Sequence, residues 1–152
     1  MAIYRLIRRQ HIPATISEVW DFFSNPANLA NITPGYMKFV VTSPPHEGDI
    51  YPGQIITYKV SPLLGIPLSW MTEITQVVPG KLFVDEQRQG PYSLWHHQHL
   101  FEPDGNGTLM TDIVHYKLPL GPLGALAKSL FVGRQLESIF DYRKKVVEEK
   151  FR

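Results

Sequence analysis

The sequence predicts an α+β fold in which a curved antiparallel sheet of about seven strands wraps around one long C-terminal helix. Between Tyr36 and Tyr116, apolar and polar residues alternate with a period of two, which is typical of strands that bury one face. Turn signals such as Pro79-Gly80 divide this region into short segments. After Pro122 the apolar residues recur at spacings of three and four, which indicates a helix. One long helix can cover the open face of such a sheet.

One strand and two short helices are expected at the start of the chain. β-branched and aromatic residues predict a strand over residues 2–11, which Pro13 ends. Ser17 is the expected N-cap of a short helix with the sequence SEVWDFF. Pro26 can then open a second short helix that runs to Ile32.

The remaining strands follow one another with short connections. They are predicted over residues 36–42, 53–60, 68–78, 81–89, 94–103 and 107–117. Hairpins join such neighbours most simply, so we expect the strands to pair antiparallel in sequence order.

The C-terminal helix is predicted to be about thirty residues long, or on the order of 45 Å. Its apolar face consists of Leu123, Leu126, Ala127, Leu130, Leu136, Ile139, Phe140, Arg143, Val146, Val147 and Phe151. Arg143 is the cation in this apolar stripe. Its guanidinium either reaches solvent past a buried stem or faces an acidic group of the sheet.

Composition excludes several classes of protein. The chain has 152 residues, enough for one domain over 1–152, and its 43% hydrophobic and 19% charged residues argue against disorder. There is no Cys, which excludes disulfide scaffolds, thiolate metal centres and cysteine nucleophiles. A net charge of +1 gives no general attraction to nucleic acid. No apolar stretch is long enough to span a bilayer or to serve as a signal peptide, so we expect a cytoplasmic protein.

Side chains on a strand alternate between its two faces, and one face of this sheet carries the large aromatic residues. That face also carries polar and ionisable side chains, and we expect it to lie against the helix. Its candidate binding residues are Trp70, Phe83, Asp85, Gln87, Trp95, His97, His99, Phe101, Met110, Asp112 and Tyr116, with Arg143 added from the helix. The same alternation places Gln76 on this inner face. The opposite face is expected to meet solvent with Glu73, Glu86, Arg88, His96, Gln98 and Thr111.

Asp85, His97, His99 and Asp112 are the most informative of these residues. Ionisable groups on a buried face are costly unless they pair with one another or with a ligand. The two histidines can therefore be core residues bonded to the carboxylates, or they can line a ligand pocket. Two histidines two positions apart can also bind zinc or iron with a carboxylate, but the sequence does not fix a third ligand.

Two apolar segments are candidates for the mouth of a pocket. The loop over residues 61–68, SPLLGIPL, has no charged residue, and residues 118–133 have almost none. The second segment is either a well-buried helix start or, as we favour, a gate over the pocket together with the 61–68 loop. Such segments, if exposed, could also contact a membrane or a partner.

Two stretches of sequence resemble a known superfamily. FVDEQRQGPYSLWHHQHLFEPDGNGTLMTDIVHYKLPLGPLGALA, followed by IFDYR, and the earlier VWDFFSNPANLANITP are similar to the bacterial ligand-binding, cyclase/dehydrase-like branch of the SRPBCC superfamily. These START-like and pollen-allergen-like domains have the helix-grip fold. The resemblance covers nearly the whole chain and implies a START-like ligand-binding domain with a pocket between the sheet and the long helix. It implies neither a metal nor a cofactor, and the superfamily includes carriers, sensors and enzymes.

Three functions remain open, and a binding protein is favoured. It would hold a small hydrophobic or amphipathic molecule, such as a lipid-like, polyketide-like or isoprenoid compound with a carbonyl or hydroxyl group. The alternative is a polyketide cyclase or dehydratase-type enzyme. There, His97 or His99 would be the general base, Asp85 or Asp112 would orient it, and Tyr116 would polarise a carbonyl. The third possibility is a structural role, and the chain is expected to be a monomer or a homodimer.

Overall fold

The computed structural model describes residues 3–152, except for the side chains of residues 128 and 129. Within this range seven strands form one antiparallel sheet in the order β1-β7-β6-β5-β4-β3-β2. The strands are β1 (Tyr4–Ile12), β2 (Val40–Val41), β3 (Ile55–Val60), β4 (Leu68–Val78), β5 (Leu82–Gln89), β6 (Leu94–Asp104) and β7 (Gly107–Lys117). Strands β2 to β7 pair in sequence order, as expected, and β1 adds to the β7 edge. The predicted strand over 2–11 begins at residue 2, which lies outside the described residues.

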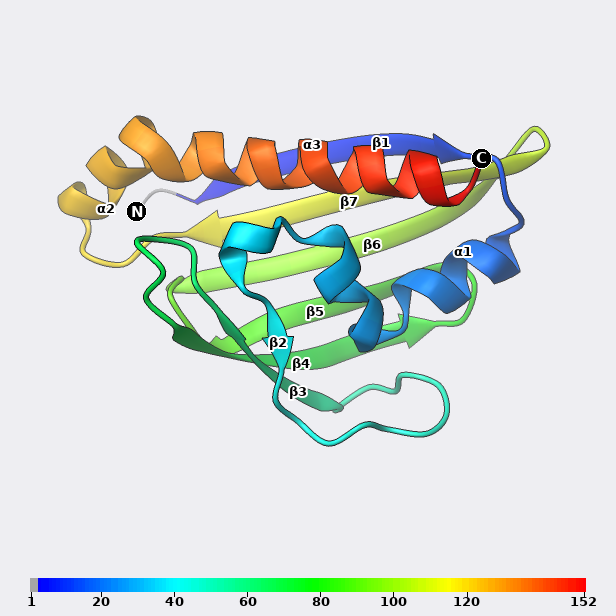
Figure 1. Ribbon diagram of the computed structural model, residues 1–152, viewed down its shortest axis with the longest axis horizontal. Helices are drawn as coiled ribbons and strands as arrows, with labels where there is room; N and C mark the ends of the chain where they lie inside the picture. The colour runs from blue at the N-terminus through cyan, green and yellow to red at the C-terminus, as the bar shows by residue number, and fades with distance from the viewer. Residues whose placement is uncertain (1–2) are drawn as a thin grey trace.

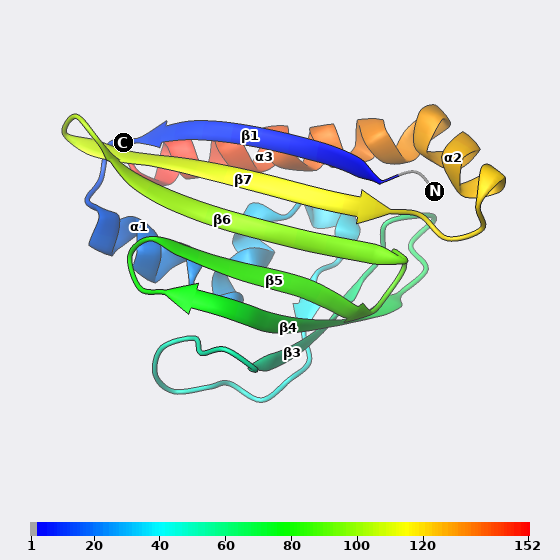
Figure 2. The ribbon, with the colours of Figure 1, turned by 180° about the vertical axis from the view of Figure 1, so that it is seen from behind.

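The helices lie on one face of the curved sheet, which is clear when the views from the two sides are compared (Figures 1 and 2). The C-terminal helical segment runs along β1 and β7, and α1 (Ile16–Phe23) lies near the end where the chain terminates (Figure 1). This arrangement is the helix-grip fold that the sequence predicts.

The N-cap of helix α1 lies two residues earlier than expected. Thr15, not Ser17, is the N-cap: its hydroxyl accepts a bond from the Glu18 backbone N–H, and Glu18 accepts one from the Thr15 backbone N–H. This reciprocal pair is a capping box, in which Glu occupies the third helical position. Ser17 cannot form it, because the residue three positions later is Trp20. The second short helix is present as a 3-10 helix over Pro26–Ile32.

The strand expected over residues 36–42 is largely absent from the described structure, where only Val40–Val41 pairs with β3. A 3-10 turn over Gly35–Met37 replaces its first half, and Lys38 follows with a positive φ of 48°. Met37 is buried in this turn, and its carbonyl accepts a hydrogen bond from the Ser61 backbone N–H. Pro34-Gly35 favours this turn over an extended chain.

The C-terminal helix has the expected length, but a π-helical turn interrupts it. It consists of α2 (Pro122–Ala127), the π turn Lys128–Val132 and α3 (Gly133–Lys150). In α3, Leu136, Phe140 and Val147 are buried against the sheet. A π turn adds a residue and so rotates the preceding helix relative to this stripe. Leu126 and Leu130, predicted on the buried face, are exposed, and Leu123 is exposed where it lines a cavity described below.

The strand faces agree with the sequence at most positions, and two predictions are wrong. A β-bulge between Ile74 and Gln76 shifts the alternation of β4, so that Val77 packs against the core and Gln76 is exposed. Thr111 is buried although it lies on the outer face, because β7 lies between β1 and β6. Its short side chain pairs there with the longer Arg9 and Leu100.

Helices that could span a bilayer are absent from the described residues, since none is both long and apolar enough.

Candidate functional site

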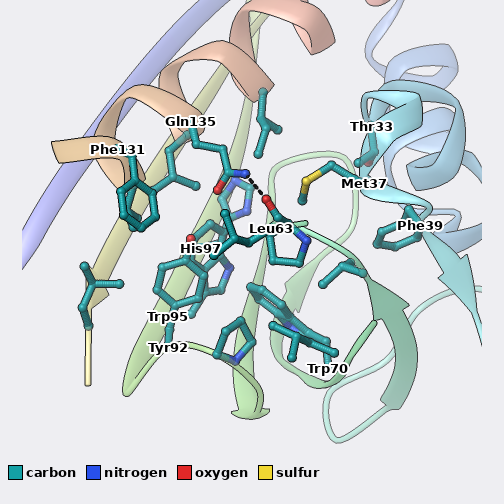
Figure 3. Close-up of a pocket in the computed structure, with 18 of the residues that line it drawn as sticks. Thr33, Met37, Phe39, Leu63, Trp70, Tyr92, Trp95, His97, Phe131 and Gln135 are labelled. Atoms are coloured by element: carbon teal, nitrogen blue, oxygen red, sulfur yellow. Dashed lines mark hydrogen bonds between the residues drawn. The ribbon is translucent and has the colours of Figure 1, made fainter. Parts of the chain in front are cut away.

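A cavity of about 410 Å³ lies between the inner face of the sheet and the C-terminal helix. Its wall is mostly aromatic and aliphatic, and Trp70, Tyr92 and Trp95 form one side of it (Figure 3). The aromatic lining residues are Phe39, Tyr58, Trp70, Tyr92, Trp95, Phe131 and Phe140. They come from the β2–β3 region, the sheet centre and the helix, so only the folded chain brings them together.

Both segments predicted at the mouth of a pocket contribute residues to the cavity lining. Pro62 and Leu63 come from the β3–β4 loop, and Leu120 and Leu123 come from the start of the helical segment. Gln135 Nε2 on α3 donates a 2.6 Å hydrogen bond to the Pro62 carbonyl, which joins the loop to the helix (Figure 3). The loop tip is largely in solvent, with Leu64 87% exposed.

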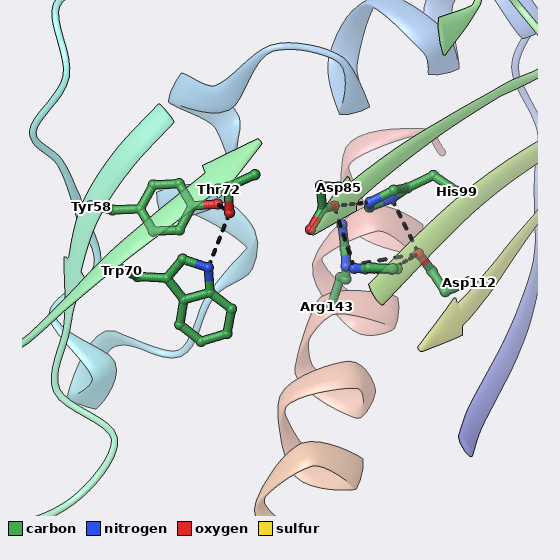
Figure 4. A network of polar contacts seen from close by, with 8 residues as sticks. Tyr58, Trp70, Thr72, Asp85, His99, Asp112 and Arg143 are labelled. Carbon is green, nitrogen blue, oxygen red and sulfur yellow. Dashed lines mark hydrogen bonds and ion pairs between the residues drawn. The ribbon is translucent and has the colours of Figure 1, made fainter. Parts of the chain in front are cut away.

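The polar end of the cavity is a cluster of five ionisable side chains, Asp85, His97, His99, Asp112 and Arg143. Figure 4 shows Asp85, His99, Asp112 and Arg143 close together. His97 Nε2 lies 2.8 Å from Asp112 Oδ1, and His99 Nε2 lies 2.6 Å from Asp85 Oδ2. His99 Nδ1 is 3.4 Å from the same Asp112 oxygen, and Arg143 Nη1 is 4.0 Å from it. The two imidazole rings stack with their centroids 3.7 Å apart. His97 thus pairs with Asp112 and His99 with Asp85, as the cost of burial predicts, but His99 Nδ1 and Arg143 Nε are buried with no hydrogen-bond partner among the described residues.

The protonation of the cluster follows from these contacts. Burial and the charge of His99 lower the pKa of His97. Burial acts on His99 in the same direction, but its contacts with Asp112 and Asp85 outweigh burial and raise its pKa. Burial would raise the pKa of Asp112, yet Arg143 and the two histidines hold it well below its ordinary value. The pKa of Asp85 is lowered by the two histidines in the same way.

These shifts favour the neutral form of His97 and the protonated form of His99, and in those forms the two cations balance the two carboxylates. Neutral His97 places its proton on Nε2, where Asp112 accepts it. Its Nδ1 then carries a lone pair and lies 3.7 Å from Asp85 Oδ2, beyond hydrogen-bond distance. Because His97 lines the cavity, this nitrogen can accept a proton or a hydrogen bond there.

A second polar group, Tyr58, Trp70 and Thr72, lies on β3 and β4, apart from the ionisable cluster (Figure 4). Thr72 Oγ1 accepts a 3.0 Å bond from Trp70 Nε1 and lies 2.6 Å from the Tyr58 hydroxyl. Tyr58 and Thr72 share one bond between two hydroxyl groups, so one hydroxyl proton remains for another acceptor. Tyr58 lines the cavity, and burial raises its pKa, so the hydroxyl stays protonated.

The structure divides the sequence-predicted binding residues into four groups. Trp70, Asp85, Trp95, His97, His99 and Arg143 line the cavity. Asp112 lies behind the imidazoles, where it borders a smaller cavity of about 50 Å³ with Met110 and Arg143. Phe83, Phe101 and Met110 belong to the hydrophobic core with α1, and Phe83 stacks on His99 at 4.0 Å.

Gln87 and Tyr116 lie elsewhere. The Gln87 amide exchanges two bonds with the Tyr92 backbone and so closes the β5–β6 hairpin. Tyr116 packs against Tyr4 and Tyr92 and borders a separate cavity near β1. Arg143 does face Asp112, and its guanidinium also lies over the rings of Phe23 and Phe140.

Sequence reasoning missed several lining residues. Tyr58, Tyr92 and Gln135 contribute to the cavity but were not among the candidates. Alternation along the predicted strand 53–60 could have identified Tyr58, which follows the buried Ile56 on the same face. Tyr92 and Gln135 carry no such signal, because their positions depend on a turn and on the rotation of the helix.

Comparison with known proteins agrees with this geometry. Residues 12–140 match the family model described as polyketide cyclase / dehydrase and lipid transport. The chain belongs to this family. Its helix-grip fold and its match to the model confirm the SRPBCC resemblance. No curated protein matches the sequence.

Solved structures similar to this family member share its fold at low identity. Major latex-like protein 151 from Panax ginseng is 15% identical with a TM-score of 0.70, over 100% of this chain and 99% of that one. TTHA0849 from Thermus thermophilus is 18% identical with a TM-score of 0.69, over 97% of each chain. Ms6760 from Mycobacterium smegmatis is 16% identical with a TM-score of 0.67, over 99% and 98%.

The cluster also contains a donor set for a metal ion. One ligand atom each from Asp85, His97 and His99 lies within 4.8 Å of the others. Asp85 is thus the carboxylate that the sequence alone could not identify.

Proposed function

We propose that this protein binds a small, largely apolar molecule with one neutral polar group in the cavity between the sheet and the C-terminal helix. The observation that carries the proposal is the aromatic cavity of about 410 Å³ with a polar cluster at one end. Ligand sites commonly have volumes of about 300–1,000 Å³, apolar walls and a few placed polar groups. The family description, which names polyketide cyclases and lipid transport, supports the same class of ligand.

The charge of the cluster determines which kind of polar group the ligand can carry. Asp85 and Asp112 are balanced by Arg143 and protonated His99, so a charged ligand would leave an uncompensated charge in a buried site. A hydroxyl group can donate to His97 Nδ1, and a carbonyl can accept the spare hydroxyl proton of the Tyr58–Thr72 pair. We therefore propose a lipid-like, polyketide-like or isoprenoid molecule with a hydroxyl or carbonyl group.

Binding can be tested with the neutral fluorescent probe N-phenylnaphthylamine and with native mass spectrometry of the purified protein. Ala127 lines the cavity on α2, whereas Ala125 on the same helix is exposed. Ala127→Phe should lower the probe affinity at least tenfold by filling the cavity, and Ala125→Phe should leave it unchanged. A wild-type protein that binds neither the probe nor any co-purified small molecule would refute the proposal.

Acid–base catalysis at the same site is the second candidate function, and the free Nδ1 of His97 favours it. His97 lines the cavity, and Asp112 orients its ring through Nε2 at 2.8 Å. Tyr58, rather than the expected Tyr116, lines the cavity and can polarise a carbonyl. A bound aryl methyl ketone such as acetylnaphthalene should then exchange its methyl protons with deuterated water faster than in buffer. His97→Gln should abolish this acceleration, and its absence in the wild type would leave binding as the function.

The remaining expectations belong to this proposal. We propose that residues 1–152 act as one ligand-binding domain, as a cytoplasmic monomer or homodimer that does not bind nucleic acid. Size-exclusion chromatography with light scattering measures the oligomeric state directly.

A further inference from the structure

Three donor atoms converge at the polar end of the cavity. Asp85 Oδ2 lies 2.6 Å from His99 Nε2 and 3.7 Å from His97 Nδ1. Two imidazole nitrogens and one carboxylate oxygen form a donor set that Zn²⁺ and Fe²⁺ accept when they keep coordination positions open. All three residues border the cavity, so an ion bound there would have its open positions toward the cavity.

We propose that Asp85, His97 and His99 bind a divalent transition-metal ion at the deep end of the cavity. The proposal goes beyond the function proposed above, because the aromatic wall would hold an apolar molecule with or without the ion. It identifies the carboxylate that completes the pair of histidines on β6.

Asp112 supports both imidazoles from the side opposite the proposed ion. Its Oδ1 atom lies 2.8 Å from His97 Nε2 and 3.4 Å from His99 Nδ1. Each ring thus turns one nitrogen toward Asp112 and the other toward Asp85. Histidines that bind metals usually donate their second ring N–H to a carboxylate or carbonyl, which fixes the tautomer and the ring orientation. Asp112 performs this role for His97, and it lies 3.4 Å from His99 Nδ1, beside that ring but without a hydrogen bond to it.

The distances fit an ion after a small adjustment. With bonds of about 2.1 Å, two donor atoms of a tetrahedral set lie about 3.4 Å apart. The 3.7 Å between Asp85 Oδ2 and His97 Nδ1 is close to this value. The 2.6 Å contact between Asp85 and His99 has to lengthen by under about 1 Å, and the ion replaces the proton between these atoms, which leaves to solvent. Asp85 borders the cavity, so its carboxylate has room to rotate.

The charges around the site determine how strongly we expect it to bind the metal ion. The ion brings two positive charges and displaces one proton, so the cluster, whose Arg143 lies 4.0 Å from Asp112, gains one positive charge. A cation so close to the site opposes binding of a second cation. We therefore expect micromolar affinity for the wild type, and tighter binding when Arg143 is replaced by the neutral Met. A purely structural ion-pair cluster would not show this second effect.

The test is a metal titration of the metal-depleted full chain. Calorimetry with Zn²⁺ should give one equivalent bound, and Co²⁺ should give visible absorption bands of a four- or five-coordinate site. Asp85→Asn, His97→Gln and His99→Gln should each weaken Zn²⁺ binding at least tenfold. Arg143→Met should strengthen it at least threefold. Failure of the wild type to bind either ion, or binding that survives all three ligand variants, would overturn the proposal.

A surface pair of histidines provides the matched control. His96 and His115 lie on the outer face with ring centroids 6.4 Å apart and could bind an ion adventitiously. The double variant His96→Gln/His115→Gln should keep the affinity of the wild type, and loss of binding in it would also overturn the proposal. If the ligand variants fail to fold, nitrogen-15 NMR of the wild-type imidazoles decides: Zn²⁺ should shift His97 and His99 but not His96. N-phenylnaphthylamine binding is measured separately, so either proposal can fail without the other.

Discussion

His97 Nε2 on β6 lies 2.8 Å from Asp112 Oδ1 on β7, and the contact runs diagonally across the strand pair. The register places Val114 directly opposite His97, and Asp112 directly opposite His99. The Asp112 carboxylate therefore lies close to His99, which is directly opposite it. It also lies close to His97, two residues along β6, because side chains two residues apart point to the same face of a strand. Asp112 is the centre of the buried cluster, and both rings lose a partner if it is removed.

Replacing either buried histidine by Leu should destabilise the fold. His97→Leu leaves Asp112, and His99→Leu leaves Asp85, without the bonded imidazole in a low-dielectric site. Each change should lower the free energy of unfolding by about 2–4 kcal/mol, measured by urea melts. His96→Leu, on the outer face of the same strand, should cost under about 0.5 kcal/mol. A His96 variant that is the most damaging would mean that the strand faces are inverted.

Stability should fall as the pH rises above the ordinary histidine pKa of 6.5, because the folded pKa of His99 is raised. The folded chain then keeps a proton that the unfolded chain releases. The stability from this proton is fully present below pH 6.5 and is lost as the pH rises through the folded pKa. Urea melts at several pH values, with a chelator present, should show this decline. His99→Gln should lack it, and an unchanged decline in that variant would contradict the assignment.

The loss of folding stability at acid pH should depend on His97 and Asp112. The folded pKa of His97 is lowered, so the unfolded chain binds more protons below pH 6.5 and stability falls there as the pH falls. Asp112, whose pKa lies well below 3.8, adds a further loss as the pH falls below that value. In equilibrium unfolding, the stability of His97→Gln should decline less steeply than that of the wild type as the pH falls from 6.5 to 3.8. If the stability of His97→Gln declines as steeply as that of the wild type, the loss of stability in this pH range comes from other groups.

The bond between Gln135 and the Pro62 carbonyl should slow passage through the cavity mouth. Gln135→Met removes the bond while keeping the length of the side chain, so release of N-phenylnaphthylamine should be several times faster in stopped-flow experiments. Gln10→Met is the matched control, because Gln10 donates a 2.9 Å bond to the Lys144 carbonyl of α3 far from the mouth. Equal release rates in the wild type and Gln135→Met would show that the loop and helix do not act as a gate.

The N-terminus of α1 offers a test of the observed cap. Thr15→Ala removes the capping box with Glu18 and should cost about 1 kcal/mol in thermal or urea unfolding. Ser17→Ala, at the cap that the sequence suggested, should change stability by less than about 0.5 kcal/mol. The reverse order of the two effects would place the cap at Ser17.

The sequence was informative about the sheet because side-chain direction in a strand is a local property. Alternation alone placed His97, His99, Asp85 and Asp112 on the inner face, and their burial cost predicted that they pair. The same rule failed at Gln76, because a bulge between neighbouring strands changes the alternation without a clear signal in one strand. At Thr111, the longer side chains of flanking strands determine the burial.

By itself, the sequence determined the order of the elements, the inner face of the central strands and the presence of the long C-terminal helix. The tertiary structure alone decided which inner residues border the cavity. Phe83 and Phe101 face the helices as predicted, yet α1 covers them, whereas Trp70 and Trp95 remain on the cavity wall. A cavity is the space that distant elements leave when they pack, and its lining depends on the path of α1 and the rotation of the C-terminal helix. These are sums of many long-range contacts, which no periodicity within a single segment encodes.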